Sequence, residues 1–229
     1  VIVRGSGMTT ALRRALNAAK VPVAIPPASL ALRDEPAVRP FLAALDLVTA
    51  GEETVPGDLA LDLLTSPLGG ADPVVLRRLR RALRREELAL GGARTSDELL
   101  GAALFEPVLL ASLGPEGTPA RRVARVLDAG RAAFAQSGES GDAEHVLWAM
   151  WQASGLAEPW EANALSGGVA GTRADRDLDA VVALFGAAAT YADRLPGAAV
   201  RDFLDHVRGQ DVPGDRLVAA APDDDAVAL

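Results

Sequence analysis

The sequence predicts a mainly α-helical protein in which a long helical segment is inserted between strand-containing stubs of an α/β domain. β-branched residues gather at 1–3 and again at Val21 and Val23, as in short strands. The last residues, 226–229, resemble the start of another strand after a polar loop. Between these ends the apolar residues recur at helical spacing, which favours a helical insertion.

The first fifty residues have an α/β pattern. Gly5 and Gly7 follow the strand-like start, a helical pattern continues over 12–19, and the prolines at 26–27 interrupt the chain. A proline at position 36 then begins a pattern that predicts a helix over 36–48.

From position 51 onward the patterns are helical and are separated by Gly and Pro. The predicted helices share apolar residues three and four positions apart. They cover 57–65, 73–90, 96–104, 119–136, 142–153, 175–194 and 197–207.

Composition excludes several classes of protein. The chain has 229 residues and is 49% hydrophobic, which is enough to bury a core. It contains no cysteine, so disulfides and thiolate metal sites are excluded. No apolar run approaches the roughly 20 residues that cross a bilayer, and no signal peptide is recognisable at the start. We therefore expect no membrane partner and a cytoplasmic location, and we expect a piece of a longer polypeptide because position 1 is not methionine.

Charge is distributed unevenly along the chain. The net charge is −8, but residues 1–125 carry 16 basic and 14 acidic side chains, whereas 126–229 carry 7 and 17. Six arginines fall between Arg77 and Arg85. The mean charge therefore hides a local basic surface.

The arginine-rich segment predicts an amphipathic helix. Asp72 and Pro73 are typical of a helix start, and the glycines at 91–92 are typical of its end. Leu76, Leu79 and Leu83 would lie on one face. The arginines would lie largely opposite, with position 84 at the side and position 80 near the apolar border: Arg77, Arg78, Arg80, Arg81, Arg84 and Arg85.

Two interpretations of this face carry equal weight on physical grounds. A row of arginines can simply be solvated and paired with local acids such as Glu86, for tenths of a kcal/mol. Alternatively, six neighbouring like charges repel one another, and a polyanion would relieve that repulsion. Arginine favours bidentate contact with phosphate, and the glycines Gly69 and Gly70 would let backbone N–H groups approach an anion.

A family resemblance favours the second interpretation. The segments VIVRGSGMTTALRRALNAAKVPV, LRDEPAVRPFLAALDLV and LLTSPLGGADPVVLRRL resemble, in order, segments of UvrD/RecB-like superfamily 1 DNA helicases. HVLWAMWQASGLAEPW and the late RDLDAVVALFGAAATYADRLPGAAVRDFLDHVRGQ are similar to the helical 2B subdomain of the actinobacterial AdnA/AdnB-type members. The ending DDDAVAL resembles the approach to helicase motif V.

The resemblance implies a domain plan. Residues 1–50 would be part of the second RecA-like domain (2A), 51–222 the helical 2B subdomain, and 223–229 a return strand to the RecA-like domain. Arg4 and Ser6 would lie near the single-strand groove, although the family's Asn-Ala-Gln-Ser-Arg is replaced here by residues 5–9. Gly69, Gly70 and the arginine helix would face duplex phosphates.

The resemblance also implies a division of labour. The parent would be an ATP-dependent 3′–5′ DNA helicase of repair or recombination, using ATP and Mg²⁺. This chain has no phosphate-binding GxxxxGK[ST] loop and no acidic Mg²⁺ motif, so we expect neither a cofactor nor catalysis from the fragment alone. Its expected partners are DNA at a single-strand/duplex junction and a partner helicase-nuclease subunit.

Other candidate residues favour structural roles. His145 and His206 lack ligand spacing and are expected at the surface or at caps. The tryptophans at 148, 151 and 160 are expected in the core, and the aspartates at 223–225 in a solvated turn. The alternative function is an all-α interaction or regulatory module whose cationic helix docks on an acidic protein surface.

Overall fold

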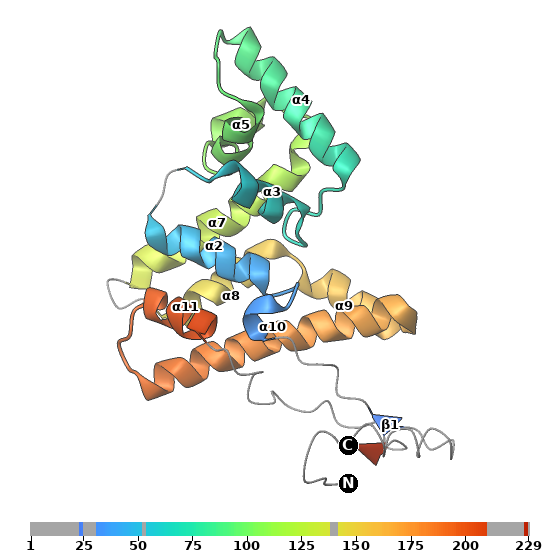
Figure 1. The fold of residues 1–229 in the computed structure, drawn as a ribbon, viewed down its shortest axis with the longest axis vertical. Helices are drawn as coiled ribbons and strands as arrows, with labels where there is room; N and C mark the ends of the chain where they lie inside the picture. Colours follow the sequence, from blue (N-terminus) through green and yellow to red (C-terminus); the bar gives the residue numbers. More distant parts are fainter. Residues whose placement is uncertain (1–22, 25–30, 52–53, 138–141, 210–226, 229) are drawn as a thin grey trace. The chain divides into compact units, whose positions relative to one another are not determined.

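The computed structural model describes residues 23–24, 31–51, 54–137, 142–209 and 227–228 (Figure 1). Contacts group the chain into two units, one comprising 1–32 with 210–229 and the other 33–209. The expected strand at 1–3, the expected helix at 12–19, and the residues 5–9 lie outside the described residues.

The unit formed by the two ends of the chain contains a parallel pair of short strands. β1 is Val23–Ala24 and β2 is Val227–Ala228. They pair in parallel, with Val23 opposite Val227 and Ala24 opposite Ala228. The sequence predicted a brief strand near each of these positions, and the structure confirms both.

The unit of 33–209 is helical over its described residues, so the chain is mainly α as predicted. After the 3₁₀ helix η1 (Leu32–Asp34), the elements are α2 (Arg39–Ala50), α3 (Gly57–Thr65), α4 (Pro73–Ala89), α5 (Ser96–Ala102), α6 (Pro107–Ala111), η2 (Pro115–Gly117), α7 (Thr118–Ser137), α8 (Ala143–Ser154), α9 (Ala157–Ser166), α10 (Gly168–Arg194) and α11 (Val200–Gly209).

Seven of these helices match predicted segments closely, but some bounds differ. α2 begins at Arg39 with Pro40 in its first turn, and the predicted start at 36 is wrong because residues 36–38 form a turn. α10 begins at Gly168, seven residues before the predicted start. α2 also groups with the helical unit, whose first residue is Arg33, whereas the sequence placed its boundary after position 50.

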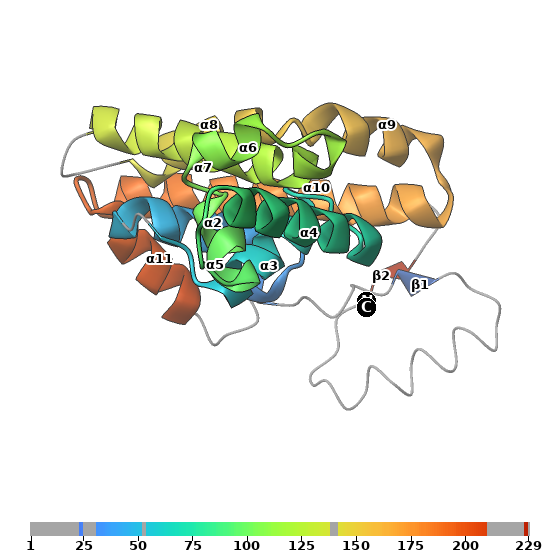
Figure 2. The same ribbon diagram turned by 90° about the horizontal axis from the view of Figure 1, so that it is seen from above.

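The centre of the helical unit is the antiparallel pair α7 and α8, covered on one side by α2 (Figure 2). Gly130 of α7 permits a close approach, because a Cβ there would stand 2.9 Å from Met150 Cγ and 3.0 Å from Val48 Cγ2. Buried apolar side chains of this layer include the aromatic Phe41 and Leu42, Leu45, Val48, Val123, Val126, Leu127, Val146, Leu147 and Met150. Each such side chain contributes about 1.5–3 kcal/mol when fully buried.

A second layer positions α4. α5 packs against both α3 and α4. The backbone of Gly101 in α5 lies so close to the carbonyl oxygen of Val55 that a Cβ atom would not fit between them. Leucines fill the space between the three helices: Leu63, Leu64, Leu79, Leu83, Leu99 and Leu100, all buried. α4 is therefore fixed along its inner face, and its outer face stays open to solvent.

The tryptophans are distributed differently from the prediction. Trp151 lies between Phe41 and Trp160, with ring centroids 5.8 and 5.7 Å away, but Trp151 and Trp160 are half-buried and not fully in the core. Trp148 packs edge-on against Phe185 at 5.7 Å but is 50% exposed. The prediction that it belongs to the core is wrong, because it lies at the outer edge of the contact between α8 and α10.

Candidate nucleic-acid interface

α4 begins and ends where its sequence predicts. The Oδ1 atom of Asp72 accepts hydrogen bonds from the N–H groups of Val74 at 2.7 Å and Val75 at 2.8 Å, and Pro73 occupies the first turn. Gly91, with φ of +76°, then turns the chain away from the helix. The cap satisfies N–H groups that a helix start otherwise leaves free.

The two faces of α4 separate apolar from basic side chains. Leu79, Ala82 and Leu83 are buried, and Leu76 is half-buried at the edge of the same face. Four arginines are exposed on the outer side, as predicted: Arg77, Arg78, Arg81 and Arg85. Among the described residues only Arg85 of these four has an ion pair, at 4.0 Å from Glu86.

The other two arginines of the helix are held by neighbours. The Nη2 atom of Arg80 donates to Asp97 Oδ1 at 2.8 Å, and the Nη1 atom of Arg84 donates to the backbone oxygen of Arg94 at 2.6 Å. Both arginines are half-buried. Arg84, predicted at the side of the helix, therefore faces the loop that connects α4 to α5.

An ion pair between buried Glu87 and half-buried Arg94 fixes that loop. The carboxylate of Glu87 is buried and accepts from the side chain of Arg94, with the shortest contact at 2.9 Å, and from its backbone N–H at 3.1 Å. Arg94 also contacts Glu106 at 3.2 Å. The side-chain hydrogen bonds from Arg94 lower the pKa of Glu87, and those carboxylates raise the pKa of Arg94. The network ties α4 to the loop that lies beside its basic side.

Gly69 and Gly70 have structural roles in this geometry. A Cβ at Gly69 would lie 2.6 Å from Leu64 Cα, and Gly70 has a φ of +67°. The Gly70 N–H donates to the Ser66 oxygen at 2.7 Å, and Asp72 caps the helix start. The Gly70 N–H and the first N–H groups of α4 therefore already have protein partners. The DNA contact predicted for the two glycines stays a prediction. Arg4 and Ser6 lie outside the described residues.

The histidines occupy the surface, as expected. His145 is exposed on α8, and His206 is exposed on α11 with its ring 5.0 Å from Tyr191. Within the described ranges there is no group of three or more His, Asp or Glu residues that could hold a metal ion. None of the helices described is long and apolar enough to cross a membrane.

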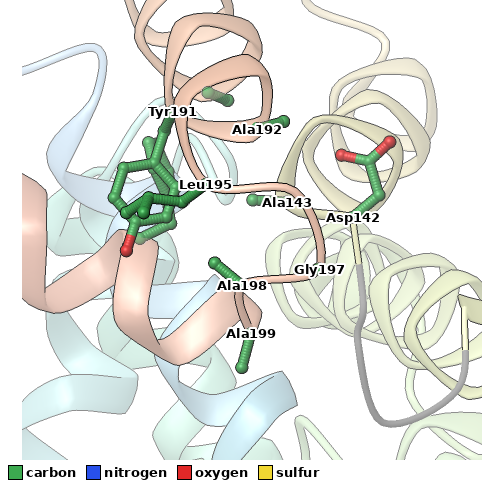
Figure 3. A pocket seen from close by; sticks show the side chains of 10 residues that line it. Asp142, Ala143, Tyr191, Ala192, Leu195, Gly197, Ala198 and Ala199 are labelled. Carbon is green, nitrogen blue, oxygen red and sulfur yellow. The ribbon is translucent and has the colours of Figure 1, made fainter.

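A pocket elsewhere in the helical unit is lined by few polar or titratable side chains. It encloses about 230 Å³ between α8, the end of α10 and the start of α11, and its lining is mostly alanine, leucine and aromatic carbon. Figure 3 shows Tyr191 and Asp142 on opposite sides of it. Asp142 caps α8 by accepting from the Glu144 N–H at 2.9 Å, so its carboxylate already serves the fold.

A second depression lies beside α4 itself. It is an open groove of about 410 Å³ lined by Leu88, by Ser96 at the start of α5, and by four arginines: Arg80, Arg81, Arg84 and Arg85. Sequence reasoning missed the contribution of Asp97 and Ser96. Their only signal is the Thr-Ser-Asp-Glu helix start that follows the glycines at 91–92.

Comparison of the chain with protein-family models and with curated proteins finds no match.

Proposed function

We propose that this chain is the DNA-binding accessory subdomain of an ATP-dependent 3′–5′ DNA helicase of the UvrD/RecB type, acting in DNA repair or recombination. Its own task is to hold duplex DNA at the single-strand/duplex junction through phosphate contacts. The observation that carries the proposal is the row of exposed arginines on the outer face of α4.

The arginine row has the physical properties of a phosphate-binding surface. Arg77, Arg78 and Arg81 have no ion pair within the described part of the chain, and their like charges repel one another. A DNA backbone would relieve that repulsion and release counterions. Arginine suits this contact because its planar fork binds two phosphate oxygens. Such contacts position a duplex without distinguishing its bases.

The parallel pairing of β1 and β2 supports an inserted subdomain. Parallel neighbours cannot be joined by a tight hairpin and need a long crossover connection. Here the whole helical unit of 33–209 lies between the two strands in the chain. This connectivity fits a helical subdomain inserted between neighbouring strands of a RecA-like domain, as the resemblance implies.

The remaining chemistry belongs to the parent protein in this proposal. ATP and Mg²⁺ would act at the interface of its motor domains, and Arg4 and Ser6 would lie near the single-strand groove of the second motor domain. A partner helicase-nuclease subunit is the expected protein partner. The fragment alone would bind DNA without hydrolysing ATP.

A fluorescence anisotropy titration with a labelled single-strand/duplex junction tests the proposal. Replacement of Arg77, Arg81 and Arg85 by alanine should weaken binding roughly 10-fold or more at low salt and reduce the salt slope by about three. The matched control replaces Arg173, Arg194 and Arg201 by alanine. These arginines are exposed on α10 and α11, so their replacement removes the same amount of charge. Weak binding that is independent of salt and equal in both triple variants would contradict the proposal.

The second candidate function is a protein-interaction module, and two exposed apolar residues favour it. Val74 and Leu88 are 46% and 57% exposed on α4. With three arginines they form a stripe spaced by alternating four and three residues, typical of a coiled-coil seam: Val74, Arg78, Arg81, Arg85 and Leu88. An acidic helix with apolar ends would match this stripe.

Separate cross-linking with DNA and with the partner subunit distinguishes the two candidates. Replacing Val74 and Leu88 by serine should leave junction binding within about twofold, since phosphate contacts need only the charges. The same change should abolish partner cross-linking if the stripe is a helix-docking seam. Partner cross-linking that this variant leaves unchanged would contradict the interaction module.

A further inference from the structure

The groove beside α4 differs from the rest of the arginine face because its walls come from two elements. Arg80, Arg81, Arg84 and Arg85 line it from α4, together with Leu88, and Ser96 lines it from the start of α5. Its volume of about 410 Å³ is open to solvent. Arg77 and Arg78 are not part of its lining.

Two of the four guanidinium groups are held in place before any ligand arrives. Arg84 is fixed by the backbone oxygen of Arg94, 2.6 Å away, and Arg94 is itself fixed by buried Glu87 at 2.9 Å. Arg80 is held by Asp97 at 2.8 Å. A ligand that binds Arg84 therefore loses less side-chain entropy than it would on a freely rotating arginine, because the Arg94 oxygen can stay in place.

Arg80 also has an unused donor. Its Nε atom is buried and has no hydrogen-bond partner among the described residues, while Asp97 accepts only from Nη2. A buried N–H without an acceptor destabilises the free protein. If the Arg80 side chain turns toward a phosphate group in the groove, Nε and Nη can donate to it together, which the single Asp97 oxygen does not allow here.

Charge and shape favour a phosphoester over other anions. Four arginines line the groove, whereas the nearby carboxylates are those of exposed Asp97, paired with Arg80, and of Glu86, 4.0 Å from Arg85. The Ser96 hydroxyl can donate to a further oxygen. Leu88 is 57% exposed and gives the groove an apolar contact for the carbon part of an ester.

We propose that this groove is a phosphoryl-binding site, in which Arg80 and Arg84 hold the phosphate, Ser96 donates to it, and Arg81 and Arg85 close over its outer side. The ligand class is a phosphate monoester or diester, either free or in a DNA backbone. The inference deepens the proposed function, on which it rests for the source of the phosphate, by assigning the groove one backbone phosphate. Asp97 is then a competitor that the phosphate displaces from Arg80.

Titration of the whole chain with pyrophosphate at constant ionic strength tests the site. The arginine Nε–Hε signals in ¹H–¹⁵N spectra report binding at individual guanidinium groups. The Arg80 and Arg84 signals should shift in a saturable manner. A chloride salt without sulfate, added to the same ionic strength as a control, should not shift them. Ser96→Ala should weaken pyrophosphate binding roughly threefold to tenfold through one lost hydrogen bond.

Two further variants separate a specific site from general attraction. Asp97→Asn should strengthen pyrophosphate binding roughly twofold to fivefold because the competing charge is removed. Arg77→Ala/Arg78→Ala, on the same helix but outside the groove, should change it by less than about twofold. Thermal unfolding of each variant by circular dichroism confirms that the fold is intact.

The outcomes distinguish the site from the proposed function. Competition between pyrophosphate and the labelled junction supports both. Pyrophosphate binding in the groove without junction binding supports the site and contradicts the DNA function. Junction binding that Ser96→Ala and pyrophosphate leave unchanged contradicts the site alone. Absence of any Arg80 or Arg84 shift, or equal weakening by Arg77→Ala/Arg78→Ala and by Arg80→Ala/Arg84→Ala, overturns the inference.

Discussion

At the scale of single residues, Glu87 holds the loop beside the basic side of α4 in place by binding Arg94. Its carboxylate is buried beneath Gly92 and is bound by Arg94 through side chain and backbone. A buried charge is tolerated only when it is paired and hydrogen-bonded, and this one has both. The sequence offers Glu86 as a local acid for the arginine row, whereas in the structure the neighbouring Glu87 is hydrogen-bonded to Arg94.

We expect Glu87→Gln to lower the thermal stability of the protein at neutral pH, because Arg94 loses the charge that fixes it. Arg94 is 37% exposed and keeps Glu106, so the expected loss comes from the weakened hydrogen bonds of buried Glu87 and is larger than that of removing a solvated charge. The matched control is Glu86→Gln, which removes the same charge from a partly exposed position. Equal midpoints of thermal unfolding, Tm, for the two variants would contradict this role of Glu87.

The same residue predicts a pH dependence. The pKa of Glu87 lies below its ordinary value of 4.5 in the folded protein, so the unfolded chain takes up the proton first as the pH falls. Its stabilising contribution is therefore complete above the ordinary pKa and is lost as pH falls through the lowered one. Chemical denaturation from pH 7 to pH 2.5 should show the difference between wild type and Glu87→Gln disappearing at the acid end. A difference that is constant with pH would contradict the assignment.

At the scale of secondary-structure elements, helical periodicity located most helices but not the shortest or least buried ones. α3 runs from Gly57 to Thr65 as predicted, because its apolar pattern and its proline and serine neighbours agree. α6 was missed because its five residues are too short for periodicity. α9 was missed because it has no buried residue, so no apolar stripe marks it.

α10 shows why element bounds depend on neighbours. Gly167 and Gly168, with φ of +70° and +71°, form a tight turn from which α10 returns along α9. Gly171 lies so close that a Cβ there would stand 3.0 Å from the Ala164 and Asn163 oxygens. Glycines at this density are typical of a loop in sequence, and only the contact with α9 makes the segment helical.

Two helical glycines should respond in opposite directions to alanine. Gly101→Ala should destabilise the fold by about 1–3 kcal/mol, because its Cβ would overlap the Val55 carbonyl between α3 and α5. Gly186→Ala should stabilise it by about 0.5–1 kcal/mol, since nothing lies within 4 Å and alanine favours the helix. Urea denaturation of both variants measures the two signs, and the same sign for both would contradict the packing described here.

At the scale of the whole molecule, the helical unit of 33–209 has its own core, which contains the buried side chains of α2, α3, α5, α7 and α8. We therefore expect residues 33–209, produced alone, to fold. Far-ultraviolet circular dichroism should show one cooperative thermal transition close to that of the full chain. A broad melt with exposed apolar surface, detected by dye binding, would show that the ends are needed for folding.

The sequence by itself determined the mainly helical class, the two short strands near the chain ends, and the basic outer face of α4. Each of these depends on local order: β-branched runs, a 3.6-residue apolar period, and a capped start at Asp72. The arginines at 77, 78, 81 and 85 are exposed as predicted because the leucines opposite them must be buried.

Only the tertiary structure decided which arginine side chains of α4 are hydrogen-bonded to neighbouring elements and which extend into solvent. Arg80 and Arg84 are fixed by Asp97 and by the Arg94 backbone, and the groove exists because α5 folds back beside α4. The close approach of Gly101 to Val55 and the burial of Glu87 make that return possible. These contacts join residues on separate helices and loops, and no local period or spacing encodes the distance between them.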